Sequence, residues 1–394
     1  MRMKSKITVA QLLQCIPDAE IEKIEEELKV NYQVKKITGK NMFKLLLMWM
    51  LEEGNTSLRM LERIYNSPEY MVLTEKWKSK TRHTSLSDRL INLDYRFFKR
   101  IYEWLVNQFG GALEEKIGSE KFVLKKFDST LVGLSEKLLH FGMNAWWPKE
   151  RHIKFSVCMT GKIPTQVRMY DTQSACSEDI ALGQVVLENT IEKGEIVVFD
   201  RWISKRETYQ KLLDNNVCFV TRLNLNVRYK LVSKNEIKED KIGDLLVKED
   251  LIVKLYHKQE KCMKDSVRMI VCEKENKEKI IFLTNLWDEY DPATITEIYK
   301  KRREIEVFFR FIKQEFGFSH FLSRNKNGIL STLYMTLITS ILVIIYKLQN
   351  RIKGYKEAKR LFIAELKELL LIEFTKTVWW SVTKLKKRYL RHYT

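Results

Sequence analysis

Residues 120–223 alternate short apolar stretches with amphipathic ones, and this alternation constrains the fold more than any other feature of the chain. The apolar stretches are rich in Val, Ile, Phe and Thr and end at Gly, Pro or charge, as strands do: FVLKKFDSTL, IKFSVCMT, PTQVRMYDT, EIVVFD and VCFVTRL. Helical patterns lie between the last three of them, at residues 178–193 and Lys205–Asp214. This order predicts an α/β (α+β) fold in which a mixed sheet is flanked by helices.

The flanking regions have different patterns. Residues 1–115 are helical, and we expect an N-terminal domain that is either a helix-turn-helix type DNA reader or a plain helical bundle. Residues 226–285 alternate polar and apolar positions, as in LIVKLYHK, SVRMIVCE and KIIFLTNL, which predicts a β-rich insertion. Residues 346–394 form a basic helical C-terminal region, so the central domain spans 120–345.

A run without charge, GILSTLYMTLITSILVIIY at residues 328–346, is long enough to cross a membrane. It contains five Ser or Thr residues and is flanked by basic residues on both sides, so it has no orientation bias. We interpret it as a buried core helix and expect no membrane association. The first twenty residues contain no apolar run of the signal-peptide type.

The chain is strongly basic, with 70 Lys and Arg against 51 Asp and Glu and a net charge of +19. The excess is spread along the sequence, which favours a polyanionic partner, nucleic acid above all, over a charge that serves solubility alone. The six cysteines include no C-x-x-C pair, which argues against a zinc site and a disulfide framework and suits a reducing cytosol. We therefore expect a cytoplasmic, nucleoid-associated protein.

The segment YKKRREIEVFFRFIK, residues 299–313, combines dense positive charge with helical periodicity. On a helix, one polar edge within an arc of roughly 60° beside the apolar stripe carries Tyr299, Arg302, Glu306 and Lys313. An i,i+4 ion pair would explain Arg302 and Glu306 but not the other two residues. A carboxylate among cations and a phenol suits a site that binds a metal ion and a phosphodiester together.

Two aspartates are candidates to complete such a site. Asp128 ends the apolar stretch FVLKKFD, and Asp200 ends EIVVFD and is followed by Arg201. An acid at the end of a buried strand is costly unless it is paired or bound to a metal. The alternative, capping of the helix that follows the strand, applies better to Asp200 than to Asp128.

The spacing Y-x2-R-x3-E-x6-K resembles the signature of bacterial insertion-sequence transposases of the "insertion sequence four" type, whose catalytic core is an RNase H-like DDE domain. FDST at Asp128 is similar to the first catalytic block of that family, and FDRW with FVTRL, residues 199–202 and 219–223, is similar to the second. The resemblance spans residues 120–345. Trp202 departs from it, because the family commonly has a small residue there; the indole either reshapes a DNA contact or packs.

The resemblance implies that Asp128, Asp200 and Glu306 are catalytic and hold two Mg²⁺ ions, or Mn²⁺ in their place. It implies cleavage at transposon ends and transfer of the 3′-OH into target DNA. Tyr299, Arg302, Lys313 and Arg201 would bind DNA. The partners would be double-stranded DNA, at the terminal inverted repeats and the target, and a second copy of the chain in the synaptic complex. Trp287 is either a residue that stacks on a flipped base or a tryptophan at the edge of the core.

Two other functions stay open at this point. One is a metal-dependent nuclease on the same fold without strand transfer, and the other is a non-enzymatic DNA-binding derivative. The presence of all three acids does not favour the latter.

Overall fold

The structure is a computed structural model, and its elements divide into two compact units. The first unit comprises Met1–Phe109 with Arg310–Thr394, and the second comprises Gly110–Phe309. The structure describes residues 7–52, 57–74, 80–110, 115–117, 120–134, 142–144, 151–171, 177–184, 194–237, 241–257, 261–287, 289–318, 321–323 and 325–390.

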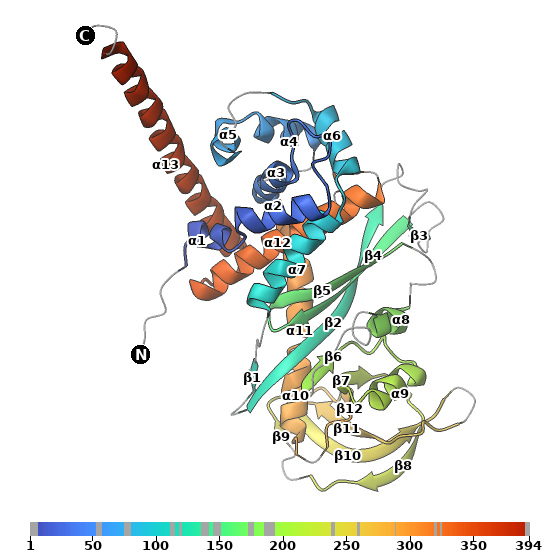
Figure 1. The fold of residues 1–394 in the computed structure, drawn as a ribbon. Coiled ribbons are helices and arrows are strands. Elements are labelled where there is room, and N and C mark those ends of the chain that lie inside the picture. Colours follow the sequence, from blue (N-terminus) through green and yellow to red (C-terminus); the bar gives the residue numbers. More distant parts are fainter. Residues whose placement is uncertain are drawn as a thin grey trace. The chain divides into compact units, whose positions relative to one another are not determined.

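The first unit is helical throughout its described residues (Figure 1). Its helices are α1 (Val9–Gln14), α2 (Asp18–Glu27), α3 (Gly39–Leu51), α4 (Leu58–Tyr65), α5 (Pro68–Thr74), α6 (His83–Asn92), α7 (Arg96–Phe109), α12 (Lys326–Gln349) and α13 (Tyr355–Leu390). Helix α3 is rich in apolar residues and buries most of its length.

Helix α12 is the core of the first unit. It is the one described helix that is long and apolar enough to cross a membrane, but its whole apolar window is buried inside the protein. It packs against α3, α6, α7 and α13 of its own unit. Its Ser and Thr hydroxyls donate to backbone carbonyls three or four residues earlier, so burial leaves them bonded: Ser331, Thr332, Thr336, Thr339 and Ser340. A core helix is therefore what this run forms.

The second unit is built on a sheet. Its strands are β1 (Glu115–Ile117), β2 (Glu120–Leu134), β3 (Met143–Asn144), β4 (Arg151–Thr160), β5 (Ile163–Tyr170), β6 (Glu195–Val198), β7 (Cys218–Leu223), β8 (Tyr229–Lys234), β9 (Lys241–Ile242), β10 (Leu245–Leu255), β11 (Val267–Lys274) and β12 (Lys279–Thr284). Its helices are α8 (Glu178–Leu182), α9 (Arg206–Asp214) and α10 (Pro292–Lys300), and α11 (Arg303–Glu315) begins in it.

The sheet is mixed. Among the described residues its strands follow the order β3-β4-β2-β6-β7-β12-β11-β10-β8, with β5 beside β4. The pairs β2–β6 and β6–β7 are parallel, and the remaining pairs of this path are antiparallel. The β-rich segment predicted at 226–285 thus continues the central sheet through the antiparallel pairing of β12 with β7.

Both faces of this sheet are covered, and alternation along each strand assigns its residues to one face or the other. Phe127, Val197 and Phe219 join a core with α8 and α9, whereas Leu124, Val198 and Val220 join a core with α10. This arrangement is the predicted mixed α/β architecture.

The predicted border at 345 does not coincide with a border between the compact units. Residues 310–345 group with the N-terminal helices, because α12 supplies the apolar surface on which those helices pack. Compact units and functional domains are different divisions, and the predicted domains 1–115, 120–345 and 346–394 stay a prediction.

Candidate active site

Asp128 lies in β2, and Asp200 follows the end of the neighbouring parallel strand β6 by two residues. In the β2–β6 pair, Val123 faces Glu195 and Lys126 faces Val198, a constant offset of 72 residues, since 195 − 123 and 198 − 126 are both 72. If the pairing is continued at this offset beyond Lys126 and Val198, Asp128 corresponds to Asp200. Both aspartates also have the parity of the residues that face α10, so they share one face of the sheet. The fold therefore brings together two acids that are 72 positions apart in sequence.

Arg302 connects these strands to the helix that carries the third acid. Its Nη1 atom lies 3.5 Å from Oδ2 of Asp128, and its Nη2 atom forms an ion pair with Oε1 of Glu306. Burial alone would lower the pKa of Arg302, but the Tyr299 phenol and the carboxylates around it, Asp200 among them, raise that pKa above its usual value. One guanidinium thus lies in the field of all three predicted acids.

Asp128 has too little positive charge around it. Burial raises the pKa of its carboxyl to about 6, and the nearby acids Glu178 and Asp200 add to that rise. The Ser129 N–H, which donates to Oδ1 at 2.8 Å, and the Arg302 guanidinium act in the opposite direction without cancelling it. The charges around this carboxyl therefore do not offset the cost of ionising it in a buried position.

The helix that was predicted to run unbroken from Tyr299 past Lys313 is interrupted. Helix α10 ends at Lys300 and α11 begins at Arg303. Across the junction the backbone N–H of Arg302 donates to the carbonyl of Tyr299, and Ile305 donates to Arg302, both three residues back. Because these turns are tighter than α-helical ones, the side chains of α11 are rotated about the helix axis relative to where one continuous α-helix would place them. Tyr299 nevertheless stays close, with the Arg302 guanidinium 5.9 Å from its ring centroid.

A buried lysine fixes the start of α11 against the sheet. Lys126 lies two residues before Asp128 on the same face of β2, and its side chain is fully buried. Its Nζ atom donates to Oε2 of Glu304 at 2.7 Å and also pairs with Glu115. Glu304 precedes Glu306 by two residues, so the Lys126–Glu304 pair and the Asp128–Arg302–Glu306 contacts link the same strand to the same helix. The sequence prediction does not include Lys126; the signal was a charged residue inside an apolar strand.

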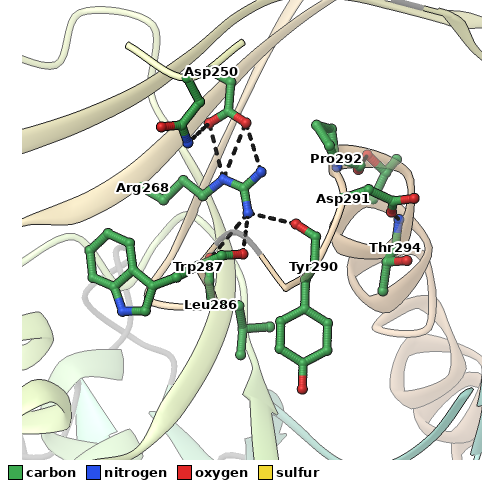
Figure 2. Close-up of polar contacts among 10 residues, drawn as sticks. Asp250, Arg268, Leu286, Trp287, Tyr290, Asp291, Pro292 and Thr294 are labelled. Atoms are coloured by element: carbon green, nitrogen blue, oxygen red, sulfur yellow. Dashed lines mark hydrogen bonds and ion pairs between the residues drawn. The ribbon is translucent and has the colours of Figure 1, made fainter. Parts of the chain in front are cut away.

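A second buried pair holds the segment that leads into α10 (Figure 2). Nη2 of Arg268 lies 2.7 Å from Oδ2 of Asp250, and both side chains are almost fully buried. Nη1 of Arg268 donates to the carbonyls of Trp287 and Tyr290, each at 2.6 Å. These bonds set the backbone just before α10, the helix whose far end carries Tyr299. The Trp287 side chain is 38% exposed, which agrees with a position at the edge of the core.

The other predicted DNA-binding residues lie outside this cluster. Arg201 is exposed in the turn after Asp200, with its guanidinium 5.9 Å from the Trp202 ring centroid. Trp202 is 71% exposed and so does not pack in the core. Lys313 is exposed on α11 two turns beyond Glu306, past the end of the second unit at Phe309.

The acids suit a hard divalent cation by chemistry, since carboxylate oxygens are the ligands that Mg²⁺ prefers. Within the described part of the chain, however, no three His, Cys, Asp or Glu side chains are close enough to hold a metal ion. The Arg302 guanidinium contacts both Asp128 and Glu306. The donor set fits the ion, and Arg302 competes with it for the carboxylates.

Comparison with known proteins identifies the family. Residues 153–342 match the model of the family described as "Transposase DDE domain". This range is just under half of the chain, and it is similar to the DDE transposases. The matched range contains Asp200, Arg302 and Glu306 and begins after Asp128. A DDE domain implies dependence on divalent metal ions in general, in agreement with the oxygen ligands of this cluster.

Three relatives share the transposase designation. "Putative transposase y4zB" of Sinorhizobium fredii is 29% identical over 47% of this chain, and the match covers about half of that relative, 51%. "Probable transposase for insertion sequence element IS5377" of Geobacillus stearothermophilus is 21% identical over 86% of this chain and 85% of its own length. "Putative transposase for insertion sequence element IS4SA" of Synechocystis is 25% identical over 76% and 80%. The predicted insertion-sequence family is thereby confirmed.

A solved structure supports the fold. The piggyBac transposase, in a cryo-EM synaptic complex with hairpin DNA, aligns with 95% of this chain and 82% of its own chain at a TM-score of 0.50 and 11% identity. At this identity the likeness concerns the fold alone. It agrees with the predicted RNase H-like α/β class, which is confirmed.

Proposed function

We propose that this transposase cuts DNA at the ends of an insertion sequence and joins the freed 3′-OH to target DNA. Asp128, Asp200 and Glu306 would hold two Mg²⁺ ions, or Mn²⁺ in their place. Such ions, when bound, neutralise charge on the attacking and leaving oxygens of an in-line phosphoryl transfer. Hydrolysis and strand transfer use one site, because both need the same positioning and the same neutralisation of charge.

The observation that carries this proposal is the pairing of β2 with β6. The register of this pair, continued at the same offset beyond Lys126 and Val198, supports Asp128 and Asp200 as neighbours on one face of the sheet, and Arg302 contacts both Asp128 and Glu306. Two parallel-strand acids and a helical acid around one cationic group form a site of high negative charge density. The raised pKa of Asp128 supports a cation as the missing partner.

We assign DNA binding to the basic residues and the tyrosine of this region. Arg302 would hold transposon-end phosphate oxygens through its fork of N–H donors, while Tyr299 would donate its hydroxyl. Because Arg302 already contacts two of the acids, we propose that it exchanges those carboxylates for a phosphate when the ions and DNA enter. Lys313 and Arg201 would contact phosphates further along the DNA.

The partners follow from the same chemistry. A net charge of +19 supports binding of double-stranded DNA, at the terminal inverted repeats and at the target. Bringing two transposon ends together requires two active sites, so we propose a homodimer in the synaptic complex. The setting would be the bacterial cytoplasm, at the nucleoid.

A joining assay tests the proposal. The full chain is mixed with Mg²⁺, a transposon-end duplex that already carries a 3′-OH, and a second duplex. We expect joined product from the wild type, and none from Glu306→Gln, which should still bind the end. Glu297→Gln is the matched control, because Glu297 is an exposed acid of α10 paired only with Lys300 among the described residues. It should join ends as the wild type does.

The outcomes separate the three functions. Hydrolysed ends without joining would replace the transposase by a metal-dependent nuclease on the same fold. Activity that survives in Glu306→Gln would refute the role of this acid. If neither wild type nor variant reacts while both bind DNA, the chain is a binding derivative.

A further inference from the structure

A basic groove in the second unit includes the residue that follows Asp200. Its volume is about 1260 Å³. It is lined by residues 201 and 204–207 after Asp200, by residues 223, 224, 226 and 227 at and after the end of β7, by residues 256, 257, 261 and 262 beyond β10, and by Asp179 of α8. Arg201 belongs to this lining and directly follows Asp200 in sequence. The groove therefore starts one residue from a candidate catalytic acid.

Three cations of the groove have no acidic partner among the described residues, whereas its acids are occupied. Arg201, Lys205 and Lys261 make no side-chain ion pair with any residue that the structure describes. The acids are engaged otherwise. Asp179 accepts from the Thr208 hydroxyl at 2.7 Å and from the Lys205 backbone N–H at 3.1 Å.

The remaining acid of the groove, Glu207, lies 3.1 Å from Nδ1 of His257. Both acidic side chains of the lining thus have partners of their own. The groove presents unpaired positive charge, which is the condition for binding a polyanion.

An exposed indole adjoins these cations. Trp202 is 71% exposed, the most exposed tryptophan for which a burial is described, and its ring lies 5.9 Å from the Arg201 guanidinium. Tyr256, on the groove wall, is held in place by the Arg206 Nε atom, which donates to its carbonyl at 3.3 Å. An exposed indole beside cations can stack on the base of a nucleotide while the cations bind its negatively charged phosphate.

We propose, resting on the function proposed above, that this groove binds an unpaired DNA segment next to the cut. Arg201, Lys205 and Lys261 hold its phosphates, and Trp202 stacks on one of its bases. The occupant is a single strand and not duplex, because the π-face of a base is free only where its neighbours do not cover it. Phosphates of a duplex would need the cations but leave the indole without a partner.

The test measures DNA binding without metal ions, so that it does not depend on catalysis. The full chain is titrated, in EDTA, into a fluorescent single-stranded oligothymidine about 12 nucleotides long, and into a duplex of the same length, with anisotropy as the readout. Trp202→Ala should weaken single-strand binding about 5- to 100-fold, the range for loss of one base–aromatic stack, and leave duplex binding unchanged. Trp202→Phe should restore most of the loss.

The phosphate contacts are tested by salt dependence. The double variant Lys205→Ala/Lys261→Ala should reduce the log–log salt slope of single-strand binding by about 1.4, at about 0.7 per phosphate contact. The matched control is Lys241→Ala/Lys248→Ala, two exposed lysines near the opposite end of β10, about 26 Å along the strand from Tyr256. This control should keep the wild-type slope.

Two results would overturn the inference. One is single-strand binding by Trp202→Ala and by the groove variant that equals that of the control. The other is an equal loss on single strand and duplex, which would make the groove a duplex-phosphate surface. These titrations contain EDTA, so they measure single-strand binding independently of the metal-dependent reaction. A failure of the joining assay with an intact Trp202 dependence would thus refute the proposed function and not the groove.

Discussion

Replacing Lys126 with Met tests whether the buried ion pairs hold α11, the helix that carries the candidate acid Glu306, against the sheet. The substitution keeps an unbranched apolar stem of similar length and removes the ammonium. It leaves Glu115, with 9% of its side chain exposed, and Glu304, with 30% exposed, without their shared partner. Lys301, 3.9 Å from Glu115, is the one described cation that remains close to that carboxylate.

The expected loss is large because the charge left behind is buried. Breaking a buried ion pair by removing one partner costs about 3–5 kcal/mol. Water reaches Glu304 in part, so we expect the lower end, about 3 kcal/mol, in the free energy of unfolding of the second unit at pH 8. The matched control is Lys300→Met, whose pair with Glu297 is half exposed on both sides. That change should alter the same free energy by no more than about 0.5 kcal/mol.

The loss should depend on pH in a defined direction. Burial already raises the pKa of Glu115, and Lys126 acts to lower it, so the variant carries an acid with a still higher folded-state pKa. Such an acid is destabilising when ionised. The penalty is therefore absent below the unfolded-state pKa, about 4.3, and grows as pH rises through the folded-state pKa. The wild type and Lys126→Met should differ far less at pH 4 than at pH 8.

Local stability is the appropriate measurement, because a chain with two compact units need not unfold in one step. Hydrogen exchange of β2 and β6 peptides, followed against urea, reports the free energy of opening this part of the sheet. The triple variant Lys126→Met/Glu115→Gln/Glu304→Gln should recover most of the loss. A cost below about 1 kcal/mol for Lys126→Met, or one that is equal at pH 4 and pH 8, would refute a structural role for these pairs.

Further outcomes follow from the same cluster. Asp128→Asn should stabilise the metal-free second unit by up to about 3 kcal/mol at pH 8 in the same exchange experiment, since a pKa of about 6 makes the ionised carboxyl unfavourable there; the gain should vanish below pH 4. Arg302→Met should raise Mn²⁺ affinity several-fold by paramagnetic titration, because a cation 3.5 Å from Asp128 competes with the metal. Lys313→Ala should reduce the log–log salt slope of transposon-end binding by about one; an unchanged slope would exclude a phosphate contact.

Much of the site is accessible from sequence because its information is local. Each acid lies at the end of an apolar segment or next to one. The four residues Tyr299, Arg302, Glu306 and Lys313 all lie within one 15-residue stretch, so their spacing can be read directly from the sequence. Strand and helix order also follow from local periodicity, which is why the α/β class and the β-rich segment at 226–285 agree with β8 to β12. The core helix α12 is predictable for the same reason.

The sequence alone therefore predicted the three candidate acids, the fold class and the family, and the last two predictions are confirmed. Tertiary structure decided how those acids relate to one another. The register of β2 and β6 sets Asp128 beside Asp200, and a guanidinium lies between the strand and Glu306. It also decided that the helix breaks after Lys300 and that Lys126 is buried between two glutamates. The physical reason is that strand register and ion pairing join residues that are tens to hundreds of positions apart, and local spacing carries no record of such contacts.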